Sequence, residues 1–402
     1  MNRRNMPLDG VVVLDLGQVY QGPYATYLMA KAGATVIKIE PPSGEPVRQR
    51  DAVSKGSGVP FALLNGHKKC ITLNLKSEVG RDLLKRLAAK ADVLLENYAP
   101  GVMDRLGIGW DTLRTVNPRL VYASGSGYGL SGPDRDNLAM DVTVQASSGM
   151  MSVTGFPEGP PVKAGPAVVD FLSGTHLYAG VLTALYERHF TGQGRLVEVA
   201  MQEAVYPTLA SNLTYYYDYD QVPPRTGNQH GGRSAAPYNV YPVKDGYIAI
   251  IGVKDLHWSN LLKAMGREDL TEDERFANKV KRVRHIEETD EIVTAWSTSL
   301  TRDEACGLLS KYNVPHAAVR DLVEVTNDRH MHERGFLQWI EHPQFGRVAI
   351  ADSPIRIHGA DTLPAEPSAK LGQHTEEVLG SMLGLSREEI EHLQRSGATT
   401  GL

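Results

Sequence analysis

The chain has 402 residues, of which 42% are hydrophobic and 22% are charged, with a formal net charge of −5. This ordinary globular composition suits two or three domains, and the near balance of 42 basic and 47 acidic residues argues against polyanion binding as the main function. Cys70 and Cys306 form no CxxC or Cys/His pattern, which argues against a disulfide framework or a zinc site. A polar N-terminus and the lack of any apolar run near ~18 residues predict a soluble, cytoplasmic protein.

Short β-branched runs alternate with helical patterns along the first half of the chain. This alternation is typical of a doubly wound parallel α/β sheet. The expected strands are residues 11–16, 35–40, 70–75, 92–96 and 120–124.

The pattern changes after about residue 200. Residues 201–219 read as one long helix, and the Pro- and Gly-rich stretch that follows indicates a domain boundary. The Asp245-Gly246 pair then predicts a hairpin, with helices continuing to about residue 311. Near the C-terminus, Ser386 and Glu389 form a capping box that predicts an ordered helix.

Two glycine-rich loops resemble phosphate-binding motifs only superficially. Residues 127–132 satisfy G-x-G-x-x-G, but Pro133-Asp134 follows where a dinucleotide site needs a helix, and no ribose-binding acid appears. We interpret this segment as a loop that needs positive φ. Residues 227–232 contain no Walker motif, and they form either a hinge or a cover whose N–H groups approach a ligand oxyanion.

Asp170 is the strongest candidate for chemistry. It stands where an apolar segment turns into a long amphipathic helix that carries Leu177 and Val181 on its apolar stripe. Asp is a favoured N-cap residue, so the carboxylate has an ordinary structural explanation. An anionic carboxylate on a rigid helix start can also attack an activated carbonyl and form a covalent acyl intermediate. The residues alone leave both interpretations open.

Several motifs occur in order along nearly the whole chain. They are Gly22-Pro23, residues 36–40 (VIKIE), residues 96–101 (ENYAPG) with 104–107 (DRLG), the segment 141–149, Asp170, and residues 371–375 (LGQHT). In this combination the chain resembles the class III CoA-transferases, the family that includes formyl-CoA transferase, carnitine CoA-transferase and the bile acid CoA-transferases.

The resemblance implies an α/β fold with a large Rossmann-like, CoA-binding domain built from both chain ends, residues 1–205 and 330–402. It further implies a linker with the glycine loop at residues 206–239, a smaller α+β domain at residues 240–329, and an interlocked homodimer. The expected partners are acyl-CoA and carboxylic acid substrates, with no nucleic acid or membrane.

The resemblance also implies the activity and the site. CoA would pass from an acyl-CoA to a free carboxylic acid through an aspartyl anhydride and an aspartyl-CoA thioester on Asp170. No metal and no cofactor beyond the CoA carried by the substrate would be needed. Asp141 would lie near the nucleophile, unless it only caps its own helix, and Gly231 and Gly232 would cover the intermediates. The CoA contacts would be Val19, Asn97, Tyr98, Val102 and Arg105, although Arg105 has the alternative of a surface ion pair with Asp104 or a neighbour.

The chain departs from formyl-CoA transferase at three positions. Tyr20, between Gln18 and Gln21, replaces a Gln near the reacting centre, while Pro41 and Leu138 replace an Arg and a Lys. These changes count against formyl and oxalyl specificity. A longer dicarboxylic acid such as succinate is the expected partner, and His230 and Tyr238 are candidate contacts for its distal carboxylate, although a His in a loop is more often plain surface. The phosphate contacts would then come from Lys38, Lys68, Lys69 or Arg135.

Two rival functions remain. The α-methylacyl-CoA racemases share the Asp at position 170 but pair it with a His immediately before position 141. Here that residue is Met140, which cannot exchange a proton, so the two-base mechanism lacks one base. A noncatalytic CoA-binding protein would bind CoA without turnover.

Overall fold

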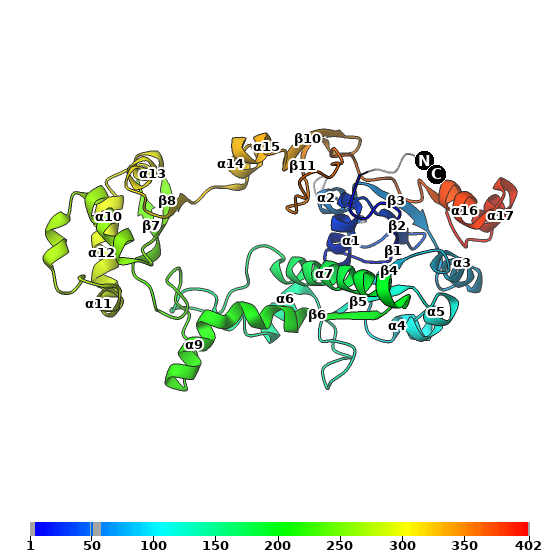
Figure 1. The fold of residues 1–402 in the computed structure, drawn as a ribbon, viewed down its shortest axis with the longest axis horizontal. Coiled ribbons are helices and arrows are strands. Elements are labelled where there is room, and N and C mark those ends of the chain that lie inside the picture. The colour runs from blue at the N-terminus through cyan, green and yellow to red at the C-terminus, as the bar shows by residue number, and fades with distance from the viewer. Residues whose placement is uncertain (1–4, 49, 51–57, 401–402) are drawn as a thin grey trace. The chain divides into compact units, whose positions relative to one another are not determined.

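The main sheet has six parallel strands in the order β3-β2-β1-β4-β5-β6 (Figure 1). This is seen in a computed structural model that describes residues 5–48, 50 and 58–400. The parallel α/β prediction is confirmed, and β6 is a strand that the sequence analysis did not predict. The strands are β1 (Val12–Asp15), β2 (Thr35–Glu40), β3 (Lys68–Thr72), β4 (Val93–Glu96), β5 (Val121–Ser126) and β6 (Leu196–Ala200).

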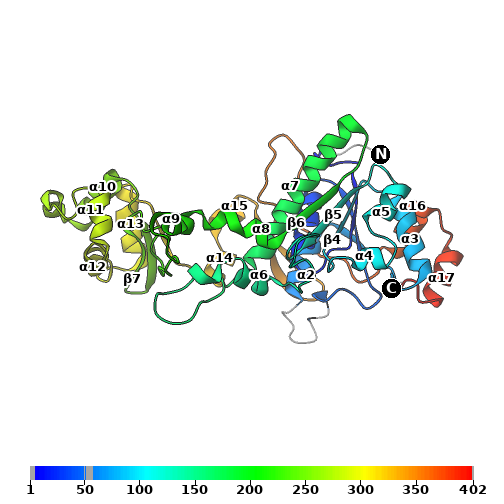
Figure 2. The same ribbon diagram turned by 90° about the horizontal axis from the view of Figure 1, so that it is seen from below.

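Helices cover both faces of this sheet because neighbouring strand residues point to opposite sides. Val13 packs on one face with α1 (Gln21–Lys31) and α7 (Val168–Thr191). Leu14 packs on the other face, and Figure 2 shows α7 on one side of the sheet and the helices of the other layer opposite. That second layer contains α3 (Glu78–Ala88), α5 (Trp110–Val116), α16 (Thr375–Leu383) and α17 (Arg387–Arg395).

The helix α7 has the length and hydropathy of a membrane span. Leu177, Tyr178 and Val181 of this helix nevertheless pack against the sheet residues Val93 and Val121. A helix that buries an apolar stripe against a sheet is an ordinary core helix. The length and hydropathy of α7 are therefore explained by its packing in this domain.

The C-terminal segment returns to the first part of the chain and completes the sheet domain. After the hairpin of β10 (Leu337–His342) and β11 (Gly346–Ala351), His374 Nδ1 accepts a hydrogen bond from the Cys70 amide at 3.1 Å. Farther along, the Thr400 amide donates to Thr72 Oγ1 at the end of β3. These contacts confirm that both chain ends build this domain.

The chain divides into two compact units. The first contains the described residues up to Val144, Pro166–Val205 and the described residues from Asp328 onward, and the second contains Gln145–Gly165 and Tyr206–Asn327. The segment 145–165 therefore groups with the second unit, whereas the sequence analysis assigned it to the large domain.

The second unit is an α+β domain around a three-stranded antiparallel sheet. Its strands follow the order β7-β8-β9, and the predicted Asp245-Gly246 turn joins the first two. Trp258 and Phe276 lie in its core. The elements are β7 (Tyr238–Val243), β8 (Gly246–Ile251), β9 (His316–Ala318), α10 (Asp255–Met265), α11 (Lys279–Arg284), α12 (Ile286–Ser297), α13 (Arg302–Lys311) and α14 (Leu322–Thr326).

The predicted single helix over residues 201–219 is wrong. The segment forms α8 (Met201–Val205), a 3₁₀ turn (Tyr206–Leu209) and α9 (Ala210–Tyr219). Pro207 lies in the turn, and a proline lacks the N–H that a continuous helix needs there. The remaining helices are α2 (Val59–Asn65), α4 (Val102–Arg105), α6 (Asp141–Ser147), a 3₁₀ turn at Met151–Val153, another at Glu268–Glu272, and α15 (Arg329–Glu333).

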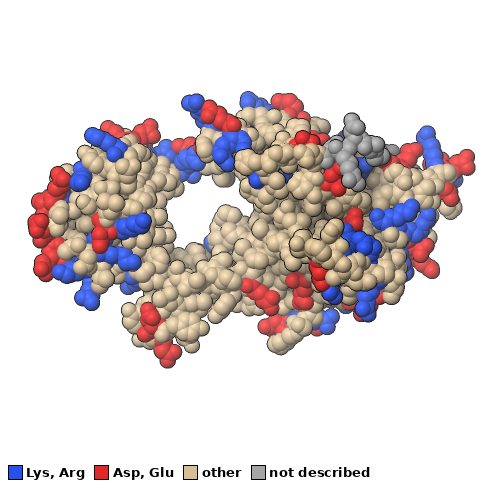
Figure 3. Space-filling model, in the orientation of Figure 1, with Lys and Arg blue, Asp and Glu red and all other residues tan. Residues whose placement is uncertain are grey.

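Charged side chains of both signs are interspersed on the face drawn in Figure 3. No basic patch of the kind that tracks a nucleic acid backbone dominates that face. An anionic ligand on this face would therefore be bound by individual basic side chains.

Candidate active site

The strand order reverses between β1 and β4, and ligands of open α/β sheets bind at the carboxyl ends of the strands at such a point. The loop from β1 into α1 turns sharply here. A Cβ on Gly22 would lie only 2.8 Å from the Cα of Gly17, so no larger residue fits at this approach. The tight turn presents Gln18, Val19 and Tyr20 at the edge of the sheet.

The residues after β4 hold this loop from the other side. The Gln18 amide donates to Asn97 Oδ1 at 2.7 Å, and Asn97 Nδ2 donates back to the Gln18 carbonyl at 3.0 Å. Val19 has a φ of 62°, which is rare for a β-branched residue, and its amide donates to Glu45 Oε2 at 3.3 Å. The structure thus brings together Val19 and Asn97, two of the predicted CoA contacts, and Tyr98 follows Asn97 directly.

Two lysines considered as phosphate contacts lie inside the sheet domain. Lys38 is 0% exposed and its ammonium donates to the Gly17 carbonyl, while Lys68 is 3% exposed and donates to Asp15 Oδ2 at 2.9 Å. Burial opposes the charge on Lys38, but nearby Asp15 and Glu45 raise its pKa above the ordinary value. Both ammonium groups are buried and bind groups of β1 and of the loop that follows it. They are not accessible to a ligand, so the prediction that Lys38 or Lys68 contacts phosphate is wrong.

Two arginines are better placed to bind phosphate. Gly101, with a φ of 78°, precedes α4, and a Cβ there would lie 3.1 Å from Arg105 Nη1 and 3.6 Å from Arg135 Nη2. The guanidinium groups of Arg105 and Arg135 therefore stand beside the same stretch of backbone. Among the described residues, Arg105 forms no ion pair with Asp104 or with another neighbour, and its role as a CoA contact stays a prediction. Val102 starts α4 beside this pair.

Asp170 lies in the first turn of α7, three residues after the N-cap residue Ala167. Asp141, at the start of α6, fulfils the capping role: its Oδ2 accepts from the amides of Val169 at 2.9 Å and Asp170 at 3.1 Å. The interpretation of Asp170 as the helix cap is therefore wrong. The carboxylate of Asp170 is left available for another task while Asp141 satisfies the helix end.

The environment of Asp170 favours the neutral acid more than water does. The residue is 8% exposed, and burial raises the pKa of its carboxyl to about 7, with Asp141 adding to the effect and Arg50 opposing it. A carboxyl that titrates near neutrality in a crevice is a candidate functional group. In the described parts of the chain, no hydrogen bond to its side-chain oxygens is formed.

Arg50 is a site residue that the sequence analysis missed. Its Nη1 donates to Tyr20 Oη at 2.9 Å, and the Tyr20 ring stacks on Phe171 with centroids 5.9 Å apart. Phe171 directly follows Asp170. The only local signal was the charged run around position 50, which cannot be told from an ordinary solvated surface.

Ser173 was missed as well. It lies one turn beyond Asp170, and Gln21 Nε2 at the start of α1 donates to its Oγ at 3.1 Å. The spacing of three residues on a predicted helix was the available signal, because such residues share a face. This bond ties the start of α7 to the β1 loop.

Gly231 and Gly232 belong to the second unit, where their loop lies against α9. A Cβ on Gly231 would lie 2.6 Å from Asn212 Nδ2, and one on Gly232 would lie 2.7 Å from the Ser211 carbonyl oxygen. The Gly232 amide donates to His230 Nδ1 at 3.2 Å, and the His230 ring contacts Tyr238 at 5.3 Å. The assignment of this loop as a cover over the intermediates stays a prediction.

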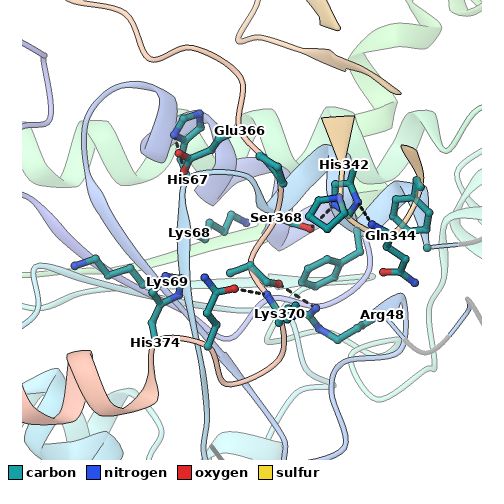
Figure 4. A pocket seen from close by; sticks show the side chains of 17 residues that line it. Arg48, His67, Lys68, Lys69, His342, Gln344, Glu366, Ser368, Lys370 and His374 are labelled. Atoms are coloured by element: carbon teal, nitrogen blue, oxygen red, sulfur yellow. Dashed lines mark hydrogen bonds and ion pairs between the residues drawn. The ribbon is translucent and has the colours of Figure 1, made fainter. Parts of the chain in front are cut away.

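A cavity of about 820 Å³ lies beside β3, between this strand and the returning C-terminal segment (Figure 4). Arg48 in its wall pairs with Glu40 at 2.8 Å, and Lys69 pairs with Glu377 at 2.6 Å. The ion pair of Lys69 with Glu377 holds the returning C-terminal segment against β3. Because its ammonium is already paired, Lys69 is also a poor phosphate contact. Lys68 and Lys69 line this cavity, whereas Asp170, Asp141 and the five predicted CoA contacts do not. Among the described residues, no group of three His, Cys, Asp or Glu side chains is arranged to hold a metal.

The chain is similar over nearly its whole length to proteins named as CoA-transferases. The chain is 34% identical over 391 residues to the succinyl-CoA–D-citramalate CoA-transferase of Chloroflexus aurantiacus, covering 96% of this chain and 97% of that protein. It is 35% identical over 410 residues to the formyl-CoA:oxalate CoA-transferase of Streptomyces coelicolor, covering 97% and 98%.

Solved structures agree. A CaiB/BaiF family protein from Brucella suis matches with a TM-score of 0.82 at 30% identity, covering 94% of this chain and all 100% of that one. A hypothetical protein from Mycobacterium tuberculosis matches with a TM-score of 0.81 at 31% identity, covering 94% and 99%. A family model described as CoA-transferase family III matches residues 8–375. Together with the folded sheet and its crevice, these matches confirm the resemblance: the chain belongs to CoA-transferase family III.

Proposed function

We propose that the protein transfers CoA from an acyl-CoA thioester to a free carboxylic acid, with Asp170 as the covalent carrier. The relatives named above are CoA-transferases, which supports the transfer itself. The observation that carries the role of Asp170 is its placement: it is a buried carboxylate in the first turn of α7, and another carboxylate caps the helix in its place.

The reaction consists of four acyl transfers. The Asp170 carboxylate attacks the donor thioester carbonyl, which forms an aspartyl anhydride and expels CoA thiolate. The thiolate attacks the aspartyl carbonyl, which forms the aspartyl-CoA thioester and releases the donor acid. The acceptor carboxylate attacks this thioester, which gives a second anhydride and CoA thiolate again. The thiolate then attacks the acceptor carbonyl, so that the new acyl-CoA leaves and Asp170 is free.

The residues around Asp170 have distinct tasks in this scheme. Asp141 fixes the start of α7 and thereby the direction of the nucleophile. Val19, Asn97, Tyr98 and Val102 line the strand ends along which CoA would extend, and Arg105 with Arg135 would bind its phosphates through the guanidinium fork. The CoA of the substrate is the one cofactor that the scheme requires.

A dicarboxylic acid is the proposed acceptor or donor acid. The Chloroflexus relatives are named for succinyl-CoA with D-citramalate or L-malate, and the second of these is 32% identical to this chain. The formyl-CoA:oxalate relatives are equally similar in overall identity, so identity does not select between the two groups. The departures at Tyr20, Pro41 and Leu138 favour the former.

Shielding and assembly complete the proposal. The loop at Gly231 and Gly232 would exclude water from the anhydride and the thioester, both of which hydrolyse readily.

Two copies would form an interlocked homodimer in the cytoplasm. Large exposed apolar side chains support association, among them Tyr186 at 70%, Phe190 at 68% and Tyr217 at 73% exposure.

The racemase alternative would need a second proton-exchanging group beside Asp170. Met140 occupies the position before Asp141 and is 54% exposed. A thioether neither donates nor accepts a proton at neutral pH, so we expect no racemisation of a 2-methylacyl-CoA.

Asp170→Asn separates a chemical role from a structural one. The amide keeps the shape of the side chain but is a poor nucleophile, so CoA exchange between carboxylates should fall below detection. Because Asp141 caps the helix, the melting temperature of the variant should not fall below that of the wild type at pH 6. CoA exchange is followed by mass spectrometry across a panel of acyl-CoA donors and acids. Retained turnover would refute the covalent proposal, and retained CoA binding by a wild type without turnover would indicate a noncatalytic protein.

A further inference from the structure

An aromatic ladder connects the proposed nucleophile to a cation. Phe171 follows Asp170 in the first turn of α7, and its ring packs edge-on against Tyr24 with centroids 4.9 Å apart. Tyr20 stacks on the same ring at an interplanar angle of 23°. The ladder ends at Arg50, whose guanidinium carbon lies 5.7 Å from the Tyr20 centroid. Side chains from three separate segments thus meet in a fixed order.

The hydroxyl of Tyr20 fixes the guanidinium. Arg50 Nη1 donates to it at 2.9 Å, in addition to the contact with the ring face. A guanidinium held in this way loses less rotational freedom when it binds a ligand than a lysine ammonium would. Tyr20, Arg50 and Phe171 are all partly exposed, so the ladder is accessible to a ligand that reaches Asp170.

The charge of Arg50 acts on the reacting carboxyl. Arg50 lowers the pKa of Asp170, opposing burial and Asp141, which both raise it. The neighbouring Arg48 lies outside the ladder, and its guanidinium binds Glu40 and the Ala369 carbonyl. Of these two arginines, only Arg50 belongs to the ladder that leads to the nucleophile.

We propose that Arg50 binds the free carboxylate of a dicarboxylic substrate, the end that does not react, while Tyr20 holds the guanidinium in place. This inference rests on the proposed CoA transfer at Asp170. A guanidinium recognises a carboxylate through two parallel N–H···O bonds, which fixes both the position and the orientation of the acid. The same contact serves the donor and the acceptor, because both acids occupy this position in turn. A monocarboxylic acyl group lacks the second carboxylate and gains nothing from Arg50.

The discriminating experiment compares two substrate pairs of equal carbon number in the full-length enzyme. One pair is succinyl-CoA with glutarate, and the other is butyryl-CoA with pentanoate. For Arg50→Gln we expect kcat/KM to fall about 10- to 100-fold with the dicarboxylic pair, mainly through KM, since bonds to charged groups have this magnitude. At a pH well above the midpoint for Asp170, where its carboxylate is the anion in both proteins, the monocarboxylic pair should change less than about threefold, within the effect of an ordinary surface substitution.

Companion variants separate the proposed role from a structural one. Tyr20→Phe removes the hydroxyl that accepts from Arg50 and should give a smaller loss confined to the dicarboxylic pair. Arg50→Lys keeps the charge without the fork and should lie between the wild type and Arg50→Gln. Arg114→Gln changes an exposed arginine of α5 that pairs with Asp111 and should leave both pairs unaffected. If Arg50→Gln does not fold, Tyr20→Phe carries the test.

Three results would overturn the inference. An equal loss with both pairs would show that Arg50 binds CoA or only adjusts the charge of Asp170. No loss of kcat/KM with either pair would show that Arg50 contacts neither acid. A wild type that prefers the monocarboxylic pair would exclude dicarboxylic selection. Failure of the proposed transfer itself looks different, because then the wild type would move CoA in neither pair.

Discussion

At the level of single residues, the main result is a division of labour between two carboxylates. Asp141 accepts from the first amides of α7, and this leaves the Asp170 carboxylate without the capping role. The sequence pointed to Asp170 but could not exclude that it was the cap, because the capping residue Asp141 lies 29 residues before it in the chain. The same limit applies to Arg50 and Tyr20, which are 30 residues apart and meet only in the folded chain.

The pKa of Asp170 predicts the pH dependence of acylation. Only the anion attacks a thioester, so the single-turnover rate should rise with pH and level off above a midpoint near 7. Asp141→Asn still accepts from the helix amides but removes a negative charge that raises this pKa. The midpoint should therefore move to lower pH, while Arg50→Gln should move it to higher pH. A stopped-flow pH profile that is identical in all three proteins would contradict this explanation.

The same pKa has a consequence for stability. A carboxyl whose pKa is higher in the folded than in the unfolded state stabilises the fold at low pH, and this contribution is lost as pH rises through about 7. Asp170→Asn removes this dependence. Chemical denaturation should show the variant gaining stability relative to the wild type between pH 5 and pH 8, by up to about 3 kcal/mol, since about two pH units in this window each contribute about 1.4 kcal/mol.

At the level of elements, the strands made of continuous apolar runs were predictable from the sequence, whereas the edge strand β6 was not. The central strands are continuous apolar runs, as expected for a sheet covered on both faces. Strand β6 lies at an edge, alternates in exposure and contains Glu198, so it lacked that signal. Lys38 illustrates the converse: because β2 is buried, its lysine had to be internal, and the sequence analysis wrongly considered it for phosphate binding.

The close packing of α1 against α7 leads to a prediction. A Cβ on Gly174 would lie 2.6 Å from the Gln21 carbonyl oxygen, so Gly174→Ala forces the two helix starts apart. We expect a loss of about 1–3 kcal/mol in the free energy of unfolding and a fall in kcat, because Asp170 lies one turn away. Gly307→Ala is the control: this glycine of α13 has open space around it, and alanine there should stabilise the protein slightly. Equal effects of the two substitutions would count against tight packing at this contact.

At the level of the whole molecule, the return of the C-terminal segment to β3 came from the family resemblance rather than from any local pattern. The residues that make the contact, such as His374 with Cys70, are 304 positions apart in the chain. No periodicity or spacing predicts a contact of that kind. The grouping of segment 145–165 with the second unit was missed for the same reason.

The proposed interlocked homodimer also belongs to this level. Light scattering should give twice the chain mass of 44.0 kDa. Interlocked chains cannot separate without unfolding, so tagged and untagged protein mixed in the native state should form no mixed dimers, whereas mixing before refolding should yield them. A monomeric mass would contradict the dimer, and rapid native exchange would contradict the interlocking.

The central claim is that Asp170 becomes acylated during turnover. The most direct measurement is mass spectrometry of the Asp170 peptide after incubation with an active acyl-CoA donor and hydroxylamine, which captures an activated aspartyl group as its hydroxamate. We expect a peptide about 15 Da heavier than the unmodified one, the mass of an added NH, and no such product without donor. An unmodified Asp170 peptide, recovered while CoA transfer proceeds, would contradict it.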